Sequence, residues 1–311
     1  MRFDAQAHVP TGTVIWEGFM VPLRDIAAEM SGGAVEVDIQ PVGAIAPHEL
    51  ADAVADGRCC SAESSMLDTE NIPEAAVATS PPFSYTDVRQ IMDFWYNYRG
   101  GEAIQMLEAA YEKQGLKLIT LIPFCGTYGA MTKFPVSGVD DFAGKTFRSI
   151  GTYAQMVRAM GGTPVNIRLA DVYEALETDK IQGVVMDLSG LVDFGWKDLI
   201  KYVMLPPIVP SSPTTYIYNL DKWNAMSAQA REVISGAARK AVNTSLFEYS
   251  RGIEQRAFDA ISGSGIQKVT LSGEAFDRYK AIGDPIWDAI EAKSDNNRHL
   301  VAMLREYLRT V

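Results

Sequence analysis

Residues 138–187 read GVDDFAGKTFRSIGTYAQMVRAMGGTPVNIRLADVYEALETDKIQGVVMD, and this stretch carries the clearest pattern of alternating strands and helices in the chain. Three runs rich in apolar and β-branched residues predict strands, and the two stretches between them have the spacing of amphipathic helices. In chain order these elements cover residues 145–150, 153–160, 165–167, 170–177 and 181–186. A strand, a helix and a second strand in succession form the β-α-β unit of a parallel sheet, so the segment predicts an α/β fold.

The same alternation extends towards both ends of the chain. Before the quoted segment, strands are predicted at residues 2–8, 35–39, 58–62 and 116–122, and helices at about 15–30, 47–54 and 87–114. After it, strands are predicted at residues 201–205 and 215–218. In the first helix, Thr11 or Thr13 is the candidate N-cap and Gly32 the end, and Pro22 should kink the helix or loosen a turn.

The C-terminal part of the chain is predicted to be mainly helical. Ser227 caps a pattern that continues to about Ile261, and a helix of about 35 residues would be about 50 Å long. Two more helices are predicted at residues 274–292 and 298–308. Because no Pro-, Ser- or Gly-rich linker separates the two β-α-β sets, we expect two lobes joined by strands, with the long helix lying across both.

Composition limits the classes of partner. The chain has 311 residues and a net charge of −11, which repels nucleic acid phosphates and anionic lipid. With 47% hydrophobic and 10% aromatic residues it can bury a large core, which excludes disorder. No run approaches the roughly 18 apolar residues that a membrane-spanning helix needs. The sequence therefore predicts a globular protein whose partners are neither nucleic acid nor a membrane surface.

The motifs of several enzyme and metal-binding classes are absent from the sequence. There is no phosphate-binding loop, no dinucleotide-binding glycine motif and no nucleophile elbow. The three cysteines (Cys59, Cys60 and Cys125) form no zinc-knuckle or disulfide pattern, and the three histidines (His8, His48 and His299) lack metal-ligand spacing. We therefore expect no catalytic residues, no metal site and no cofactor.

The quoted segment resembles the solute-binding proteins of tripartite ATP-independent periplasmic (TRAP) transporters, in the C4-dicarboxylate-binding (DctP-like) branch. The positions that match this family's pattern are Asp141, Gly144, Lys145, Arg148, Met160, Gly161, Pro164, Val172, Tyr173, Ala175, Leu176 and Gly183. Asp171 stands where the family usually has Glu. The resemblance extends more weakly over the whole chain, including the turn at residues 41–43 and the long helix.

The resemblance implies a two-lobed periplasmic binding protein fold, in which each lobe is a mixed, mostly parallel sheet wrapped by helices. We expect lobe I to comprise residues 1–124 plus 210–250 and lobe II to comprise residues 125–209 plus 251–311. The ligand cleft is expected between the lobes, and the strands that join them act as the hinge.

Arg148 is the main candidate for ligand binding. It lies in the strand at residues 145–150, and an interior strand arginine is rare unless it is paired. A guanidinium presents a planar donor fork that matches a carboxylate with two parallel hydrogen bonds. In the family this arginine grips the ligand carboxylate. The alternative is an internal salt bridge from Arg148 to Asp141 or Asp187.

Two departures from the family pattern bear on the ligand. Tyr128 occupies the position of a second arginine found in many acid-binding members, and Met186 replaces an asparagine that touches the ligand. A pocket with one arginine, an aromatic ring and a thioether favours a partly apolar or aromatic monocarboxylate. The alternative is that other polar residues have taken the place of the two lost contacts.

Further candidates lie near predicted strand ends, where open α/β sheets bind ligands. They are His8, Trp16, Glu63, Phe83, Arg168, Trp196 and Asn219. Glu63 could accept a hydrogen bond from a ligand hydroxyl or amine. For each of these residues a packing or surface role is equally open, and Arg168 is alternatively a solvated residue at a helix start.

The sequence thus predicts an extracytoplasmic solute-binding protein of a TRAP transporter that performs no chemistry. It would capture a small carboxylate by lobe closure, deliver it to the membrane permease and act as a monomer in the periplasm. Residues 1–4 lead directly into a strand, so a periplasmic location requires a signal peptide that is absent from this sequence. The alternatives are a sensing domain of a signalling receptor, or a cytoplasmic two-lobed enzyme with Asp171 or Glu63 as its base.

Overall fold

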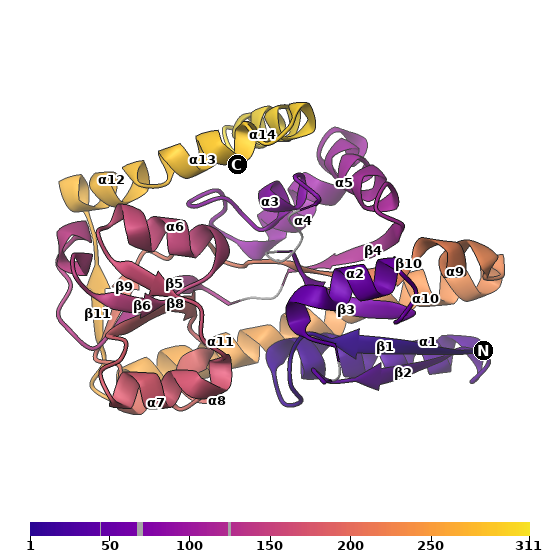
Figure 1. Ribbon diagram of the computed structural model, residues 1–311, viewed down its shortest axis with the longest axis horizontal. Helices are drawn as coiled ribbons and strands as arrows, with labels where there is room; N and C mark the ends of the chain where they lie inside the picture. The colour runs from indigo at the N-terminus through magenta and orange to yellow at the C-terminus, as the bar shows by residue number, and fades with distance from the viewer. Residues whose placement is uncertain (44, 67–70, 124–125) are drawn as a thin grey trace. The chain divides into compact units, whose positions relative to one another are not determined.

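The computed structural model describes residues 1–43, 45–66, 71–123 and 126–311 (Figure 1). Two compact units make up the chain. Unit 1 comprises Met1–Thr79, Val88–Phe124 and Pro213–Arg251, and unit 2 comprises Ser80–Asp87, Cys125–Ser212 and Gly252–Val311. The predicted lobes assign residues 80–87 to lobe I, and the structure corrects this assignment: Phe83 N–H donates to Ile208 O at 2.7 Å and the Phe83 ring packs on Tyr279, both within unit 2.

The sheet of unit 1 combines parallel and antiparallel pairs. Its strand order is β2 (Glu36–Gln40), β1 (Arg2–Ala7), β3 (Ser61–Ser65), β10 (Thr214–Asn219) and β4 (Leu116–Ile122). Strand β1 runs parallel to β2 and β3, and β10 runs antiparallel to β3 and β4. The apolar run at residues 116–122 forms β4 as predicted, whereas the strand predicted at residues 58–62 lies three residues further along the chain.

The helices of unit 1 follow the predicted pattern with two interruptions. They are η1 (Trp16–Met20), α1 (Val21–Ser31), α2 (Leu50–Ala55), α3 (Ala75–Ala78), α4 (Val88–Tyr96), α5 (Glu102–Glu112), α9 (Leu220–Ala225) and α10 (Ala228–Lys240). The first helix opens as the π-helical segment η1 and continues as α1, with Pro22 in the first turn of α1. The stretch predicted at residues 87–114 breaks because Arg99 and Gly101 have positive φ angles of 49° and 77°.

The sheet of unit 2 is also mixed. Its strand order is β11 (Gln267–Thr270), β9 (Tyr202–Leu205), β5 (Tyr128–Thr132), β8 (Gly183–Asp187), β6 (Thr146–Arg148) and β7 (Thr163–Val165). Strand β6 is parallel to β7 and β8, β9 is parallel to β11, and β5 is antiparallel to β8 and β9. The two mixed sheets with their covering helices confirm the predicted fold class.

The helices of unit 2 enclose an apolar core. They are α6 (Gly151–Ala159), α7 (Val172–Glu177), α8 (Gly190–Asp193), α11 (Phe247–Gly263), α12 (Gly273–Ala281), α13 (Asp284–Glu291) and α14 (Asp295–Tyr307). Leu176, Val184, Trp196 and Ile261 belong to one buried cluster that joins α7, β8 and α11. The helix predicted at residues 274–292 is two helices, α12 and α13, because Pro285 fits the first turn of a new helix.

The long C-terminal helix is confirmed. Ser227 Oγ accepts a hydrogen bond from Ala230 N–H at 3.2 Å and caps α10. The backbone continues through the π-helical segment η8 (Ala241–Leu246) into α11 without leaving a helical conformation. The boundary between the two units falls inside α11, after Arg251.

Candidate functional site

Arg148 is a buried cation that has no counter-ion among the described residues. It is the last residue of β6 and only 7% exposed. Its Nη1 lies 3.6 Å from Met186 Sδ and its Nε lies 3.5 Å from Ile167 O, and neither atom carries a charge. Within the described ranges no carboxylate forms an ion pair with Arg148. Burial lowers the pKa of Arg148, yet a guanidinium stays protonated in proteins, so an uncompensated positive charge remains.

The predicted alternative, an internal salt bridge from Arg148, is wrong. The Asp141 carboxylate accepts hydrogen bonds from Ser137 N–H at 2.6 Å, from the Ser137 hydroxyl at 2.8 Å and from Gly138 N–H at 3.1 Å. The Asp187 carboxylate accepts instead from the N–H and hydroxyl of Ser189. Both carboxylates are therefore bonded locally.

An aromatic pair adjoins Arg148. The rings of Tyr128, at the start of β5, and Tyr153, in the first turn of α6, stack with centroids 5.0 Å apart and an interplanar angle of 23°. Burial raises the pKa of both phenols, so both stay neutral. The positive charge of Arg148 lowers the pKa of Tyr128, but by less than burial raises it. The structure thus brings Tyr128, Met186 and Arg148 together at one end of the unit 2 sheet.

The first turn of α6 adds further positive potential. Its N-cap position, Ile150, has no capping side chain, and the first helical bond runs from Ala154 N–H to Ile150 O at 3.2 Å. Among the described residues none accepts a hydrogen bond from the N–H groups of residues 151–153. Free N–H groups at a helix N-terminus attract anions, and this terminus follows Arg148 by three residues.

Asp187 was not predicted as a site residue and is the second buried charge in this region. It is 3% exposed and lies opposite Tyr128 in the pairing of β5 with β8. Burial raises the pKa of Asp187 to about 6, against the lowering effect of the Ser189 hydrogen bonds. The negative charge of Asp187 raises the pKa of Arg148, although the two groups form no ion pair in the described part of the chain. A serine two residues after a strand-end aspartate is the sequence signal that could have revealed this local bonding.

His8 and Glu63 come together in unit 1. His8 Nδ1 lies 2.6 Å from Glu63 Oε2, and Glu63 is fully buried. His8 immediately follows β1, and Glu63 lies inside β3 next to Ala7. The strand predicted at residues 58–62 would place Glu63 just after its end, whereas Glu63 lies within β3, which continues to Ser65.

Three aromatic candidates are mainly packed against other residues. Trp16 lies in η1 and is 8% exposed. The Phe83 ring makes edge contacts with Phe276 and Tyr279, at centroid distances of 6.2 and 4.9 Å. Trp196 is fully buried in the core cluster of unit 2 and stacks on Phe194 at 5.3 Å. For Trp196 the structure therefore supports the packing role.

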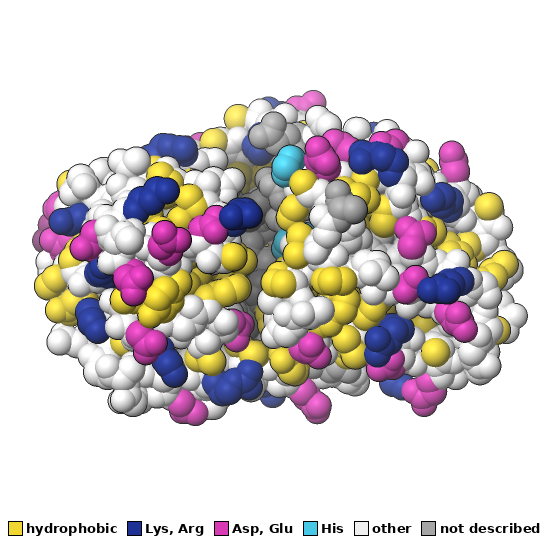
Figure 2. Space-filling view, turned by 60° about the horizontal axis from the view of Figure 1, so that its bottom comes forward, with side chains coloured by type: hydrophobic (Ala, Val, Ile, Leu, Met, Phe, Trp, Pro, Cys, Tyr) yellow, Lys and Arg dark blue, Asp and Glu magenta, His cyan; other side chains and the backbone are white. Residues whose placement is uncertain are grey.

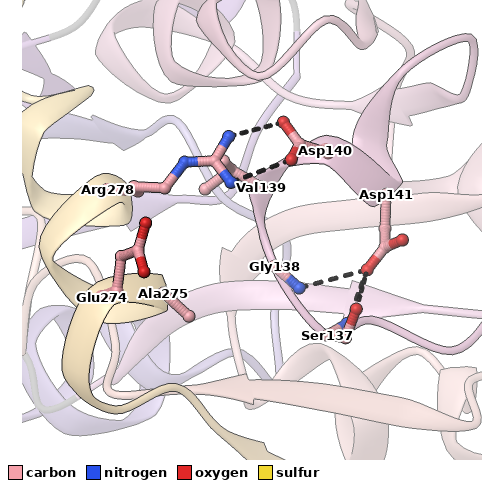
Figure 3. A pocket seen from close by; sticks show the side chains of 8 residues that line it. All are labelled: Ser137, Gly138, Val139, Asp140, Asp141, Glu274, Ala275 and Arg278. Atoms are coloured by element: carbon pink, nitrogen blue, oxygen red, sulfur yellow. Dashed lines mark hydrogen bonds and ion pairs between the residues drawn. The ribbon is translucent and has the colours of Figure 1, made fainter.

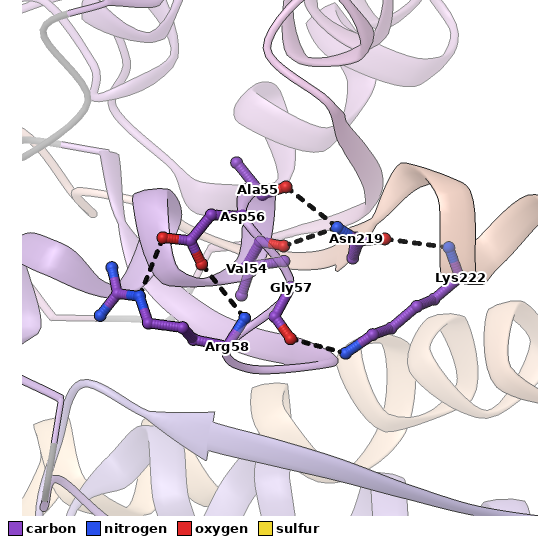
Figure 4. A network of polar contacts seen from close by, with 7 residues as sticks. All are labelled: Val54, Ala55, Asp56, Gly57, Arg58, Asn219 and Lys222. Atoms are coloured by element: carbon purple, nitrogen blue, oxygen red, sulfur yellow. Dashed lines mark hydrogen bonds and ion pairs between the residues drawn. The ribbon is translucent and has the colours of Figure 1, made fainter.

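Asn219 and Arg168 also have local partners. Asn219 caps α9 by accepting from Lys222 N–H at 2.9 Å, and its amide group donates to the carbonyls of Val54 and Ala55 (Figure 4). Both polar atoms of the Asn219 side chain are thus hydrogen-bonded, and they connect α9 to the end of α2. The Arg168 side chain is 84% exposed and pairs with Asp171 at 2.8 Å, as expected of a solvated residue at a helix start.

Among the described residues the cysteines form no second site. Cys59 and Cys60 are free and buried, and burial raises the pKa of both thiols to about 11, which keeps them unreactive. Cys125 lies outside the described residues. In the part of the chain that the structure describes, no group of three or more His, Cys, Asp or Glu side chains could hold a metal ion.

A surface pocket of unit 2 lies between η5 (Val139–Phe142) and α12 (Figure 3). Arg278 donates two hydrogen bonds to Asp140, at 2.9 and 2.7 Å, and this pairing lowers the pKa of Asp140. Both side chains are more than half exposed, so the pair fastens α12 to η5 at the surface. Figure 2 shows acidic and basic side chains interspersed over the face in view. None of the helices in the described ranges has the length and apolar composition that a membrane-spanning segment requires.

Comparisons with known proteins agree on one family. The family model described as bacterial extracellular solute-binding protein, family 7, matches residues 6–294. The ectoine-binding periplasmic protein TeaA of Halomonas elongata is 22% identical over 250 residues, which are 77% of this chain and 70% of TeaA. The ectoine/5-hydroxyectoine-binding periplasmic protein UehA of Ruegeria pomeroyi is 26% identical over 191 residues, which are 60% of this chain and 53% of UehA.

A solved structure matches the whole fold. DctP7 of Bordetella pertussis, an extracytoplasmic solute receptor binding pyroglutamic acid, superimposes with a TM-score of 0.86 at 20% identity. The match covers 98% of this chain and 99% of DctP7.

Proposed function

Because the chain belongs to the bacterial extracellular solute-binding protein family 7, we propose that it binds a small monocarboxylate through Arg148. The family consists of TRAP extracytoplasmic solute receptors, which bind small molecules and work with a membrane permease; they are not enzymes.

The unpaired Arg148 charge is the observation that carries the proposal. A buried guanidinium without a partner destabilises the protein, and an anion that pairs with it removes this cost. A carboxylate matches the planar donor fork with two hydrogen bonds. The free N–H groups at the start of α6 favour the same charge on the ligand.

The surroundings of Arg148 favour a solute with a flat or apolar body. Met186 Sδ contacts the guanidinium, and Tyr128, whose ring stacks on that of Tyr153, interacts electrostatically with it. Thioether and aromatic groups stabilise a ring or aliphatic body by about 0.3–1.5 kcal/mol per contact. Among the described residues Arg148 is the only buried lysine or arginine, so a second carboxylate on the ligand would find no second buried cation there. We therefore propose a compact cyclic or aromatic monocarboxylate.

The names of similar proteins support this choice of ligand. TeaA and UehA bind ectoine, and DctP7 binds pyroglutamic acid. Both ligands are small ring compounds with a single carboxylate. We also propose that the protein acts as a monomer in the periplasm and delivers its solute to the permease of a TRAP transporter.

The experiment is a thermal-shift screen of carboxylic acids, followed by titration calorimetry with the acids that bind. Arg148→Ala should weaken binding by about 30-fold to several thousand-fold, because the ligand carboxylate loses its two charged hydrogen bonds. Arg148→Lys should rescue binding only in part, since an ammonium lacks the donor fork.

The matched control is Arg158→Ala, which removes an exposed arginine from α6 without touching the site. It should leave binding unchanged. Wild-type affinity in Arg148→Ala would overturn the proposal, and so would preferential binding of dicarboxylates such as succinate.

A further inference from the structure

Asp187 is a buried carboxylate close to the Arg148 guanidinium in unit 2. It ends β8 directly after Met186, whose Sδ contacts Arg148, and it is only 3% exposed. In the sheet it lies opposite Tyr128 of β5. The N–H and the hydroxyl of Ser189 both donate to its Oδ1, and it forms no ion pair within the described residues. This end of the sheet therefore holds a buried cation and a buried anion that do not pair.

The strands and the helix that pack against the end of β8 contribute three titratable groups. Tyr128 on β5 and Tyr153 on α6 stay neutral, because burial raises the pKa of both phenols. Arg148 on β6 stays protonated, as guanidinium groups do in proteins. None of the three can release or take up a proton near neutral pH.

The remaining charged neighbours lie on α8 and α11. Asp193 on α8 is exposed, and its negative charge raises the pKa of Asp187. On α11, Arg256 acts on Asp193, and Glu254 accepts a hydrogen bond from a threonine hydroxyl. Residues 206–212, which pair with the start of β5, have no titratable side chain. Burial raises the pKa of Asp187 itself to about 6, so this carboxylate is the group whose charge can change.

A solute carboxylate bound to Arg148 alters the surroundings of Asp187 in two ways. It brings a second negative charge to the same buried end of the sheet. It also neutralises the guanidinium, whose positive charge interacts favourably with ionised Asp187. Both changes disfavour the ionised form of Asp187, just as two carboxylates that share a site raise the pKa of one of them. The solute carboxylate stays ionised because it pairs with the guanidinium.

We infer that the protein takes up one proton together with each solute anion and that Asp187 holds this proton. The inference rests on the proposed function, because it requires a carboxylate at Arg148. The proton comes from the solvent, and no covalent bond of the solute changes. Both Ser189 donors reach Oδ1, so a proton on Oδ2 leaves these hydrogen bonds in place. The site thus binds the solute with the net charge of the neutral acid.

The pH dependence of binding follows with a defined sign. The pKa of Asp187 is about 6 without solute and higher in the complex. Between these two values the complex holds more protons than the free protein, so the affinity falls as the pH rises. Uptake of a full proton changes Kd tenfold per pH unit. We therefore expect Kd to rise by roughly 3- to 10-fold per pH unit from about pH 6.5 to pH 8.

Titration calorimetry with pyroglutamate, benzoate and cyclohexanecarboxylate tests the inference. These anions have no group that titrates near neutral pH, so any proton taken up goes to the protein. At pH 7.5 the binding enthalpy of the wild-type protein should differ between phosphate and Tris, because the buffer supplies the proton and the two buffers differ in ionisation enthalpy. This comparison requires no variant.

Asp187→Asn keeps an acceptor for Ser189 but cannot take up the proton. The variant should bind the same acid with equal enthalpy in both buffers, and its Kd at pH 8 should stay within about twofold of its Kd at pH 6. The matched control is Asp277→Asn, an exposed change on α12 that should retain the buffer and pH dependence of the wild type.

Two results would overturn the inference: equal enthalpies in the two buffers for the wild-type protein, or a pH dependence that persists in Asp187→Asn. If binding were still lost in Arg148→Ala in that case, the proposed function would stand alone. Failure of all three acids to bind would count against the proposed function and would overturn the inference with it.

Discussion

Replacement of Asp187 by asparagine should stabilise the unliganded protein at neutral pH. Burial raises the pKa of Asp187 from 3.8 to about 6. The folded protein therefore holds the proton more tightly than the unfolded chain does. At pH values above 6 the ionised Asp187 carboxylate lowers the free energy of unfolding by its full amount. A difference of about two pKa units between the folded and unfolded states corresponds to about 3 kcal/mol.

The penalty depends on pH in a defined direction. It is absent below pH 3.8, where both states are protonated, and it grows as the pH rises towards 6. Asp187→Asn keeps an acceptor for Ser189 and carries no charge. The variant should therefore gain up to about 3 kcal/mol in the free energy of unfolding at pH 7.5 and about half of that at pH 5.

Urea unfolding of both proteins at pH 7.5 and pH 5 measures this difference. Asp277→Asn, an exposed change on α12 of the same unit, should show no comparable gain. A loss of stability in Asp187→Asn at pH 7.5, or a gain that does not shrink at pH 5, would refute the reasoning. Because Asp187 acts on Arg148, the variant should also bind monocarboxylates more tightly at neutral pH.

The remaining predictions concern packing, capping and ligand-linked stability. Gly190→Ala should lower the free energy of unfolding by about 1–3 kcal/mol in urea, because the new Cβ would lie 2.1 Å from the Trp196 ring. Gly263→Ala, with open space around the site, is its control and should be nearly neutral. Ser227→Ala should cost about 1 kcal/mol by removing the cap on Ala230 N–H, and Ser227→Asp should restore it. A saturating monocarboxylate at about 100 times its Kd should stabilise the protein by about 2.7 kcal/mol, measured as a raised Tm that is absent in Arg148→Ala.

The strands that the sequence predicted best are those with an unbroken apolar run. Strand β4 has this pattern because β10 and helices bury it, and its bounds match the prediction. Strand β11 (QKVT) could not be predicted, since it is a polar, mostly exposed strand that pairs only with β9. Strand β5 was missed for another reason: Gly129 interrupts its pattern, and only the structure shows Met204 O 3.3 Å from the position of a Gly129 Cβ.

The ends of helices depend on backbone angles that composition alone does not specify. Arg99 takes a positive φ of 49° at the break between α4 and α5, which no propensity scale predicts for arginine. Ser227, by contrast, is a common N-cap residue before an amphipathic pattern, and its role could be predicted.

For the site, the type of a residue could be interpreted from the sequence, whereas its hydrogen-bond and ion-pair partners could not. Arg148 could be singled out because an arginine inside a strand must be paired or functional. Arg168 and Asn219 were further candidates in sequence, and a nearby aspartate and a helix N-terminus satisfy them. These partners lie within one turn of the same backbone segment, so their positions depend on local backbone geometry. That geometry determines whether a polar side chain still has hydrogen-bonding groups available for a ligand.

The contrast between Arg148 and Asp187 shows how the site is kept available for a solute. Asp187 accepts hydrogen bonds from the N–H and the hydroxyl of Ser189, and within the described residues it forms no ion pair with the guanidinium. If Asp187 were free of this serine, it would neutralise Arg148 and compete with the ligand carboxylate. Local bonding of Asp187 therefore preserves the positive charge that binds the solute, and loss of the Ser189 hydroxyl should weaken solute binding through Asp187.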